Sequence, residues 1–129
     1  MGLDMNVYKT TQKTEKEIDF FDEIDMDDET VTELFYWRKH PNLHGMMERL
    51  YNKKGGGEKE FNCVPVKLDE TDLSELEFAI KNKSLPTTGG FFFGKSEESE
   101  EEVKNDLDFI EKAKEALKEG YTVYYTSWW

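Results

Sequence analysis

Apolar residues recur with two different periods along this chain of 129 residues. Three segments alternate apolar and polar side chains, as half-buried strands do: 3–8, 61–68 and 121–129. Four segments carry apolar residues three or four positions apart, as amphipathic helices do: 30–40, 41–51, 71–83 and 99–119. We therefore predict an α+β fold, with one small, mostly antiparallel sheet of three or four strands and about four helices packed on it. A chain of this length can bury one core, so we predict a single domain over 1–129.

Local signals mark the ends of several of these elements. Residues 30–33 and 99–102 each have the spacing of a capping box, which is typical of a helix start. Pro41 ends the helix predicted before it and suits the first turn of the next one. Gly120 suits the position just after a helix. Pro65 has no N–H to donate, which predicts that its strand lies at an edge of the sheet or forms a bulge.

The charge of the chain limits the classes of partner. It carries 29 Asp and Glu against 17 Lys and Arg, a formal net charge of −12, yet 14% of its residues are aromatic, unlike disordered acidic chains. Only two arginines are present, Arg38 and Arg49, so we exclude generic nucleic-acid binding, which needs a broad basic surface. The acidity then serves solubility, or mimics a polyanion towards a basic partner that the protein inhibits. Residues 10–29 mix acidic and apolar side chains, which predicts an acidic connecting segment or an arm docked on the body.

The sequence contains no targeting or anchoring signal. The N-terminus lacks the cationic and apolar regions of a signal peptide, and no apolar run approaches the ~20 residues of a membrane span. Cys63 is the only cysteine, so no intramolecular disulfide can form. We therefore predict a cytoplasmic protein that does not bind membranes. Within an apolar strand, Cys63 itself is predicted to be a buried, unreactive thiol.

Residues 36–44 gather the side chains best suited to hold a ligand. Two aromatic rings could stack on a flat group, and the guanidinium beside them has a planar fork that suits a phosphate or carboxylate. A Thr/Gly-rich turn at 87–90 adds hydroxyls and backbone N–H groups of the kind that bind anions. Because a bend at Pro41 should turn both arms of the chain towards one point, we predict a common cleft. The residues predicted to bind a ligand are Tyr36, Trp37, Arg38, His44, Thr87 and Thr88.

The sequence predicts no metal, no cofactor and no catalytic residue. His40 and His44 have the four-residue spacing of two metal ligands on a helix, but Pro41 interrupts that helix. The glycines at 55–57 lack the flanking strand and the Lys-Ser/Thr of a phosphate-binding loop. Cys63 shows no strand-to-helix turn of the kind that exposes a nucleophile.

Several segments taken together resemble a known family. They are 2–5, Tyr-Trp-Arg-Lys at 36–39, Leu-His-Gly at 43–45, 61–63, 85–94 with its Gly-Phe-Phe-Phe-Gly, and 124–129. On these segments, which span nearly the whole chain, the protein resembles a family of small proteins encoded by tailed bacteriophages, including marine and cyanobacterial ones, that also occur in metagenomes. The resemblance implies expression in the cytoplasm of the bacterial host and carries no activity with it.

Three functions remain open after this reading. The first is a phage accessory protein, not an enzyme, that binds a small anionic ligand, a nucleotide or a host protein. The second is a small enzyme in which His44 is the general acid/base and Arg38 anchors an anionic substrate. The third is an acidic inhibitor that mimics a polyanion towards a basic host protein. The sequence favours binding, because no complete catalytic set is present.

Overall fold

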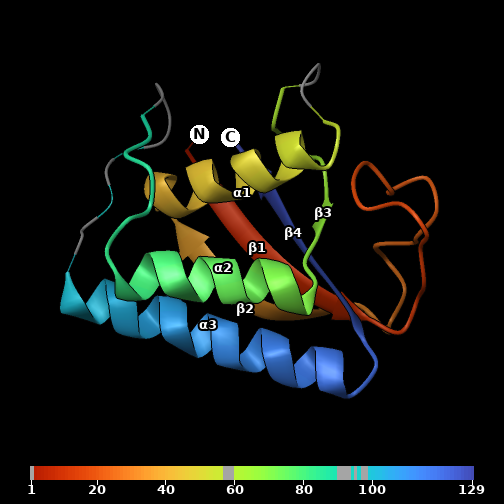
Figure 1. The fold of residues 1–129 in the computed structure, drawn as a ribbon. Helices are drawn as coiled ribbons and strands as arrows, with labels where there is room; N and C mark the ends of the chain where they lie inside the picture. Colours follow the sequence, from red (N-terminus) through yellow and green to blue (C-terminus); the bar gives the residue numbers. More distant parts are fainter. Residues whose placement is uncertain (1, 57–59, 90–93, 95, 97–98) are drawn as a thin grey trace.

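The fold is built on a four-stranded antiparallel sheet. In a computed structural model that describes residues 2–56, 60–89, 94, 96 and 99–129, the strand order is β2-β1-β4-β3. The strands are β1 (Asp4–Thr10), β2 (Thr32–Arg38), β3 (Val66–Lys67) and β4 (Thr122–Trp128). β1 and β4 pair along their whole length at the centre of the sheet, from Asp4 opposite Trp128 to Thr10 opposite Thr122. Both ends of the described chain therefore lie side by side (Figure 1).

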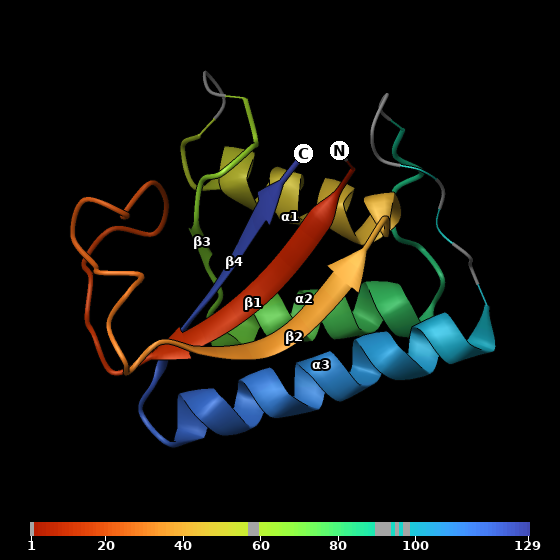
Figure 2. The same ribbon diagram turned by 180° about the vertical axis from the view of Figure 1, so that it is seen from behind.

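Three helices cover one face of this sheet. They are α1 (Pro41–Lys53), α2 (Glu70–Lys81) and α3 (Glu100–Lys118). Figure 2 shows the strands in front and all three helices behind them. The apolar residues of β1 that point towards the helices, Met5 and Val7, are fully buried. They are two positions apart, as residues on one face of a strand are. The predicted α+β fold with one antiparallel sheet is confirmed.

The opposite face of the sheet is covered in part by the long connection between β1 and β2. Phe20 and Ile24 of this connection form a second, smaller apolar cluster with Tyr124 of β4. The ring of Phe20 meets that of Tyr124 edge to face at 5.6 Å. The acidic segment 10–29 is thus held against the body of the protein by a few apolar side chains, while its carboxylates remain at the surface.

Residues 30–40 form a strand and not the helix predicted from their sequence. β2 pairs with β1, and its inward-facing Trp37 packs edge to face on Phe109 of α3 at 4.9 Å. Thr30 and Glu33, the two residues of the predicted capping box, make hydrogen bonds elsewhere: Thr30 Oγ1 lies 2.9 Å from Thr10 Oγ1, and Glu33 accepts from the Asn6 amide. Aromatic and β-branched residues dominate the segment and favour strands, so the tertiary contact decided the outcome. The described residues accordingly contain three helices, against about four predicted.

The strand predicted at 61–68 is shorter in the structure, where it is β3, although its predicted position at an edge of the sheet is confirmed. Only Val66–Lys67 pairs with β4, at the edge of the sheet, as Pro65 indicated. The prediction of a buried Cys63 is wrong, because Cys63 is exposed and turns with a positive φ of 59° before the strand begins. A residue in that left-handed conformation cannot continue a strand.

Other predicted ends agree with the structure. Pro41 is the first residue of α1, and the Ser99 hydroxyl caps α3 by accepting from Glu102 N at 3.1 Å. Gly120 follows α3 with a φ of +91°, which only glycine adopts at little cost. Among the described helices, none combines the length and apolar character required to cross a membrane.

Trp128 and Trp129 are expected to contribute very differently to stability. Trp128 is 70% exposed. Trp129 packs against the core, donates its backbone N–H to Asn62 Oδ1 at 3.0 Å, and donates its indole N–H to Phe61 O at 2.8 Å. Trp129→Ala should lower the free energy of unfolding by roughly 2 kcal/mol, below the ~3–5 of a fully buried aromatic residue. Trp128→Ala should change it by less than about 0.5 kcal/mol. Urea unfolding of both variants checks the contrast, and equal losses would contradict it.

Candidate functional site

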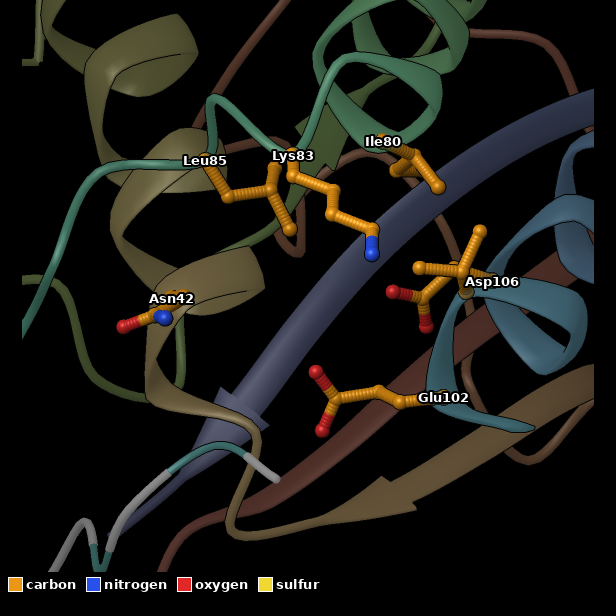
Figure 3. Close-up of a pocket in the computed structure, with 7 residues that line it drawn as sticks. Asn42, Ile80, Lys83, Leu85, Glu102 and Asp106 are labelled. Carbon is orange, nitrogen blue, oxygen red and sulfur yellow. The ribbon is translucent and has the colours of Figure 1, made fainter. Parts of the chain in front are cut away.

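A pocket lies between the start of α1, the end of α2 and the first turns of α3. We call it the central pocket; its volume is about 270 Å³. Figure 3 shows the carboxylates of Glu102 and Asp106 entering from α3 and the Lys83 ammonium reaching in from the end of α2, while Asn42 on α1 turns its amide away from the two carboxylates. Its lining residues are Asn42, Ile80, Lys83, Leu85, Glu102, Val103 and Asp106. Polar groups of both charge signs therefore face a common space with apolar walls.

Asp106 is the most deeply buried acid of the pocket. Its side chain is 2% exposed, against 15% for Glu102 one turn earlier on α3. Oδ1 accepts from the indole N–H of Trp37 at 3.0 Å, and Oδ2 lies 2.8 Å from His40 Nε2. A buried carboxylate is tolerated only where its oxygens are bonded in this way. These bonds fix the carboxylate rigidly at the wall of the pocket.

His40 continues the same network behind the pocket. It stands at the N-cap position of α1, and its own side chain does not cap the helix. Its Nδ1 lies 2.8 Å from the Ser96 hydroxyl, which in turn accepts from Asn42 N at 3.1 Å. Ser96, far away in the sequence, thus supplies the cap that α1 lacks. The network joins β2, α3, the start of α1 and residue 96.

The Thr-rich turn docks beside the pocket on α1. Thr88 N donates to Asn42 Oδ1 at 3.0 Å. A Cβ at Gly45 would lie 1.9 Å from Thr88 Oγ1, so the close approach of the turn to the helix requires glycine there. Of the predicted site residues, Thr88 therefore contacts a pocket residue, Asn42, whereas Thr87 before it is exposed. The part of this turn at 90–93, with its three phenylalanines, lies outside the described residues.

Lys83 adopts a backbone conformation that is costly for lysine. It follows α2 with a φ of +52°, at a position where helices commonly place glycine. Its N–H bonds Ile80 O at 3.2 Å and thereby closes the helix end. A non-glycine residue in the left-handed region stores about 1 kcal/mol or more of strain.

Three of the predicted residues border a second hollow on the far side of the carboxylates. Tyr36, Trp37 and Arg38 line this surface hollow of about 350 Å³ together with His40, Glu102 and Asp106. Trp37 is only 7% exposed and packs in the core, so it offers a hydrogen bond to Asp106 rather than a stacking surface. Arg38 is exposed, and the Tyr36 hydroxyl donates to Asp4 Oδ1. Tyr36, Trp37 and Arg38 thus lie close to the network without lining the central pocket.

His44 lies in the hydrophobic core, apart from the exposed Arg38. It is 1% exposed, its Nδ1 bonds the Tyr125 hydroxyl at 2.7 Å, and its ring packs on Phe61 at 4.9 Å. Burial lowers the pKa of His44 to about 4, because the apolar surroundings penalise the charged ring. The imidazole is therefore neutral at pH 7 and is aimed at Tyr125, which suits a packing role better than proton exchange with a substrate.

The side chains that could hold a metal ion differ from those weighed in the sequence. Oδ2 of Asp106, Nε2 of His40 and a carboxylate oxygen of Glu102 all lie within 4.8 Å of one another. From the sequence, His40 is a candidate metal ligand only together with His44. Sequence reasoning misses four residues of the site: Glu102, Asp106, Asn42 and Lys83. One signal was available: Asp106 falls on the inward stripe of its helix, three residues after Val103 and four before Ile110.

Comparisons with protein-family models, with curated proteins and with solved structures find no match for this chain.

Proposed function

We propose that this protein is a binding protein that holds a small molecule with a cationic or zwitterionic end in the central pocket. The single observation that carries the proposal is the pairing of groups in that pocket: the carboxylates of Glu102 and Asp106 on one wall, with the Lys83 ammonium reaching into the same space. A pocket of about 270 Å³ is at the lower end of small-molecule sites, which suits a metabolite of modest size.

The charges of the pocket determine which ligand fits. Ionised carboxylates only accept hydrogen bonds, so Glu102 and Asp106 favour an ammonium or another cationic donor. Lys83, which lines the same pocket, gives a carboxylate or phosphate of the same ligand a partner. A purely anionic ligand would bring its charge against two carboxylates, so the pocket favours an amino-acid-like zwitterion or an amine over a free nucleotide.

Binding is favoured over catalysis by the state of the acid/base candidate. His44 is buried, neutral at pH 7 and bonded to Tyr125. The Asp106 carboxylate is held by Trp37 and His40, an arrangement that can orient a ligand but supplies no activated nucleophile. On the resemblance to proteins of tailed bacteriophages, we further propose that the protein works as an accessory factor in the host cytoplasm.

A ligand screen tests this function. Purified protein in excess EDTA is melted with single amino acids, polyamines, nucleotides and phosphorylated metabolites, and each hit is titrated calorimetrically. We expect amine-bearing compounds to raise the melting temperature, because a ligand that binds only the folded state stabilises it. Ligands recovered unchanged after incubation support binding, and turnover would favour an enzyme. Hits confined to nucleotides and phosphates would contradict the proposed ligand class.

Lys83→Gly is expected to make the protein more stable and a poorer binder. Glycine relieves the left-handed strain at φ +52°, so the free energy of unfolding should rise by about 1 kcal/mol. Loss of the ammonium should weaken a zwitterionic ligand roughly tenfold, which corresponds to about 1.4 kcal/mol. Urea unfolding and calorimetry measure the two effects.

Lys81→Ala is the matched control, since Lys81 ends the same helix and does not line the central pocket. This variant should bind the ligand as the parent does. Equal loss of affinity in both variants would mean that general charge, and not the position of Lys83, supports binding.

A further inference from the structure

The cluster of His40, Glu102 and Asp106 has the composition of a metal site. Its three donor atoms come from two places in the fold: the residue before α1, and two positions one turn apart on α3. His40 Nε2 lies 2.8 Å from Asp106 Oδ2 and 3.6 Å from Glu102 Oε1. His40 and Asp106 are 3% and 1% exposed, so these donors face one another away from bulk water.

We propose that these three side chains bind one divalent transition-metal ion, with zinc as the best fit. Imidazole nitrogen combined with carboxylate oxygen suits zinc, iron and manganese, whereas calcium and magnesium prefer oxygen alone. Around a tetrahedral zinc with bonds of 2.0–2.2 Å, the donor atoms lie about 3.4 Å apart. The pair at 3.6 Å already has this spacing, and the pair at 2.8 Å needs to open by roughly half an ångström.

The groups outside the cluster hold the donors as the outer partners of a metal site do. A metal-binding histidine usually donates its second N–H to a neighbouring oxygen, which fixes the ring and its tautomer. Here His40 Nδ1 lies 2.8 Å from Ser96 Oγ, so an Nδ1–H would leave the lone pair of Nε2 directed at the cluster. The second oxygen of Asp106 is bonded by Trp37 Nε1 at 3.0 Å, which leaves Oδ2 for the ion. Both hydrogen-bond partners, Ser96 and Trp37, are residues that would not themselves contact the metal.

Charge gives a further reason for a cation at this place. Two carboxylates side by side in a largely buried position repel each other, and a divalent ion between them offsets both charges. Without an ion, His40 Nε2 and Asp106 Oδ2 lie 2.8 Å apart. The metal would lie between these two atoms and bind the lone pair that Nε2 carries in the Nδ1–H tautomer.

The cluster borders both hollows: Glu102 and Asp106 line the central pocket, and all three donor residues line the surface hollow beside Tyr36 and Arg38. Three protein ligands with an open fourth position are typical of zinc sites that hold water or a ligand, whereas structural sites are closed by four. The inference rests on the proposed function in that it assigns the metal to the same wall. An amine or carboxylate of the bound molecule would then be the fourth ligand.

Zinc titration of the metal-free protein tests the site. Protein freed of metal with EDTA and then of EDTA is titrated with zinc chloride at pH 7 by calorimetry. A long-range 1H–15N spectrum follows the two imidazoles of the chain, His40 and His44. We expect one ion per chain, with a shift of the His40 Nε2 resonance and no change at His44, which lies in the core with Tyr125.

Variants separate this site from surface carboxylates. Glu102→Gln should lower zinc affinity by at least 10–100-fold, the range seen even for outer partners of metal sites. Glu101→Gln is the control, because it makes the same charge change on an adjacent, exposed residue and should bind zinc as the parent does. Equal affinity in both variants, or zinc binding that leaves the His40 resonance unmoved, would overturn the proposal. So would the absence of any heat and any shift in the parent protein.

The same samples distinguish the two proposals. A ligand that binds in EDTA, with no zinc bound afterwards, would leave the proposed function standing without the metal. Zinc bound through His40, with no ligand found with or without the ion, would support the metal site and count against the small-molecule pocket. If Glu102→Gln does not fold, the His40 resonance of the parent still decides the question.

Discussion

Asp106→Ala is expected to lower the free energy of unfolding by about 3–5 kcal/mol, the scale seen when one partner of a buried polar pair is removed. The substitution leaves His40 Nε2 and the Trp37 indole N–H without their acceptor in a buried position. In a domain of 129 residues, this corresponds to a fall in melting temperature of roughly 10–20 °C. Thermal unfolding followed by circular dichroism measures it.

Two further variants make this prediction specific. Asp106→Asn keeps an oxygen for Trp37 and should cost less than Asp106→Ala. Asp108→Ala removes the same charge from an exposed residue of α3 and should change stability by less than about 0.5 kcal/mol. If Asp106→Ala melts within a few degrees of Asp108→Ala, the buried network does not hold the fold together as described.

Stability is also expected to fall as the pH drops from 6.5 to 4, because of His44. The ordinary pKa of 6.5 applies to the unfolded chain, whereas burial lowers the pKa of His44 in the folded protein to about 4. Between these values the unfolded state binds a proton that the folded state does not, so acid favours unfolding. The loss from this one group is about 2 kcal/mol between pH 7 and pH 5, and about 3 kcal/mol by pH 4. Above pH 6.5 the contribution of His44 is fully present.

A variant separates the effect of His44 on the pH dependence of stability from the effect of the many carboxylates. His44→Gln removes the titrating group and can still bond Tyr125, although the variant is less stable at pH 7. Urea unfolding at pH 7 and pH 5 should show a difference that is about 2 kcal/mol smaller in His44→Gln than in the parent. The same pH dependence in both proteins would mean that His44 is not buried in its neutral form.

The sequence determined the parts of the fold that depend on local rules. The two hydrophobic periods predicted an α+β protein with an antiparallel sheet, and both are present. Ser99 and Gly120 indicated the two ends of α3, because a side-chain oxygen or a left-handed turn satisfies backbone groups within a few residues. Pro65 indicated an edge strand, since proline cannot donate to a second neighbour.

Local rules failed where distant partners compete with them. The capping-box spacing at 30–33 predicted a helix, but pairing with β1 and the contact of Trp37 with Phe109 favoured a strand. The apolar pattern at 61–68 predicted Cys63 within a strand, but Cys63 lies in an exposed turn with a left-handed backbone. Neither outcome is visible in the segment itself, because the deciding atoms lie far away in the sequence.

The candidate site was the least accessible to sequence reasoning. Glu102 and Asp106 are two of 29 acids, and only burial against Trp37 and His40 distinguishes Asp106 from those in water. The sequence drew attention to the island at 36–44, and the structure divides it: His40 joins the buried network, Arg38 stays exposed and His44 enters the core. The sequence thus determined the elements and the overall balance of charge. Tertiary structure alone decided which charges left water together, because the cost of burying a charge depends on the groups that surround it.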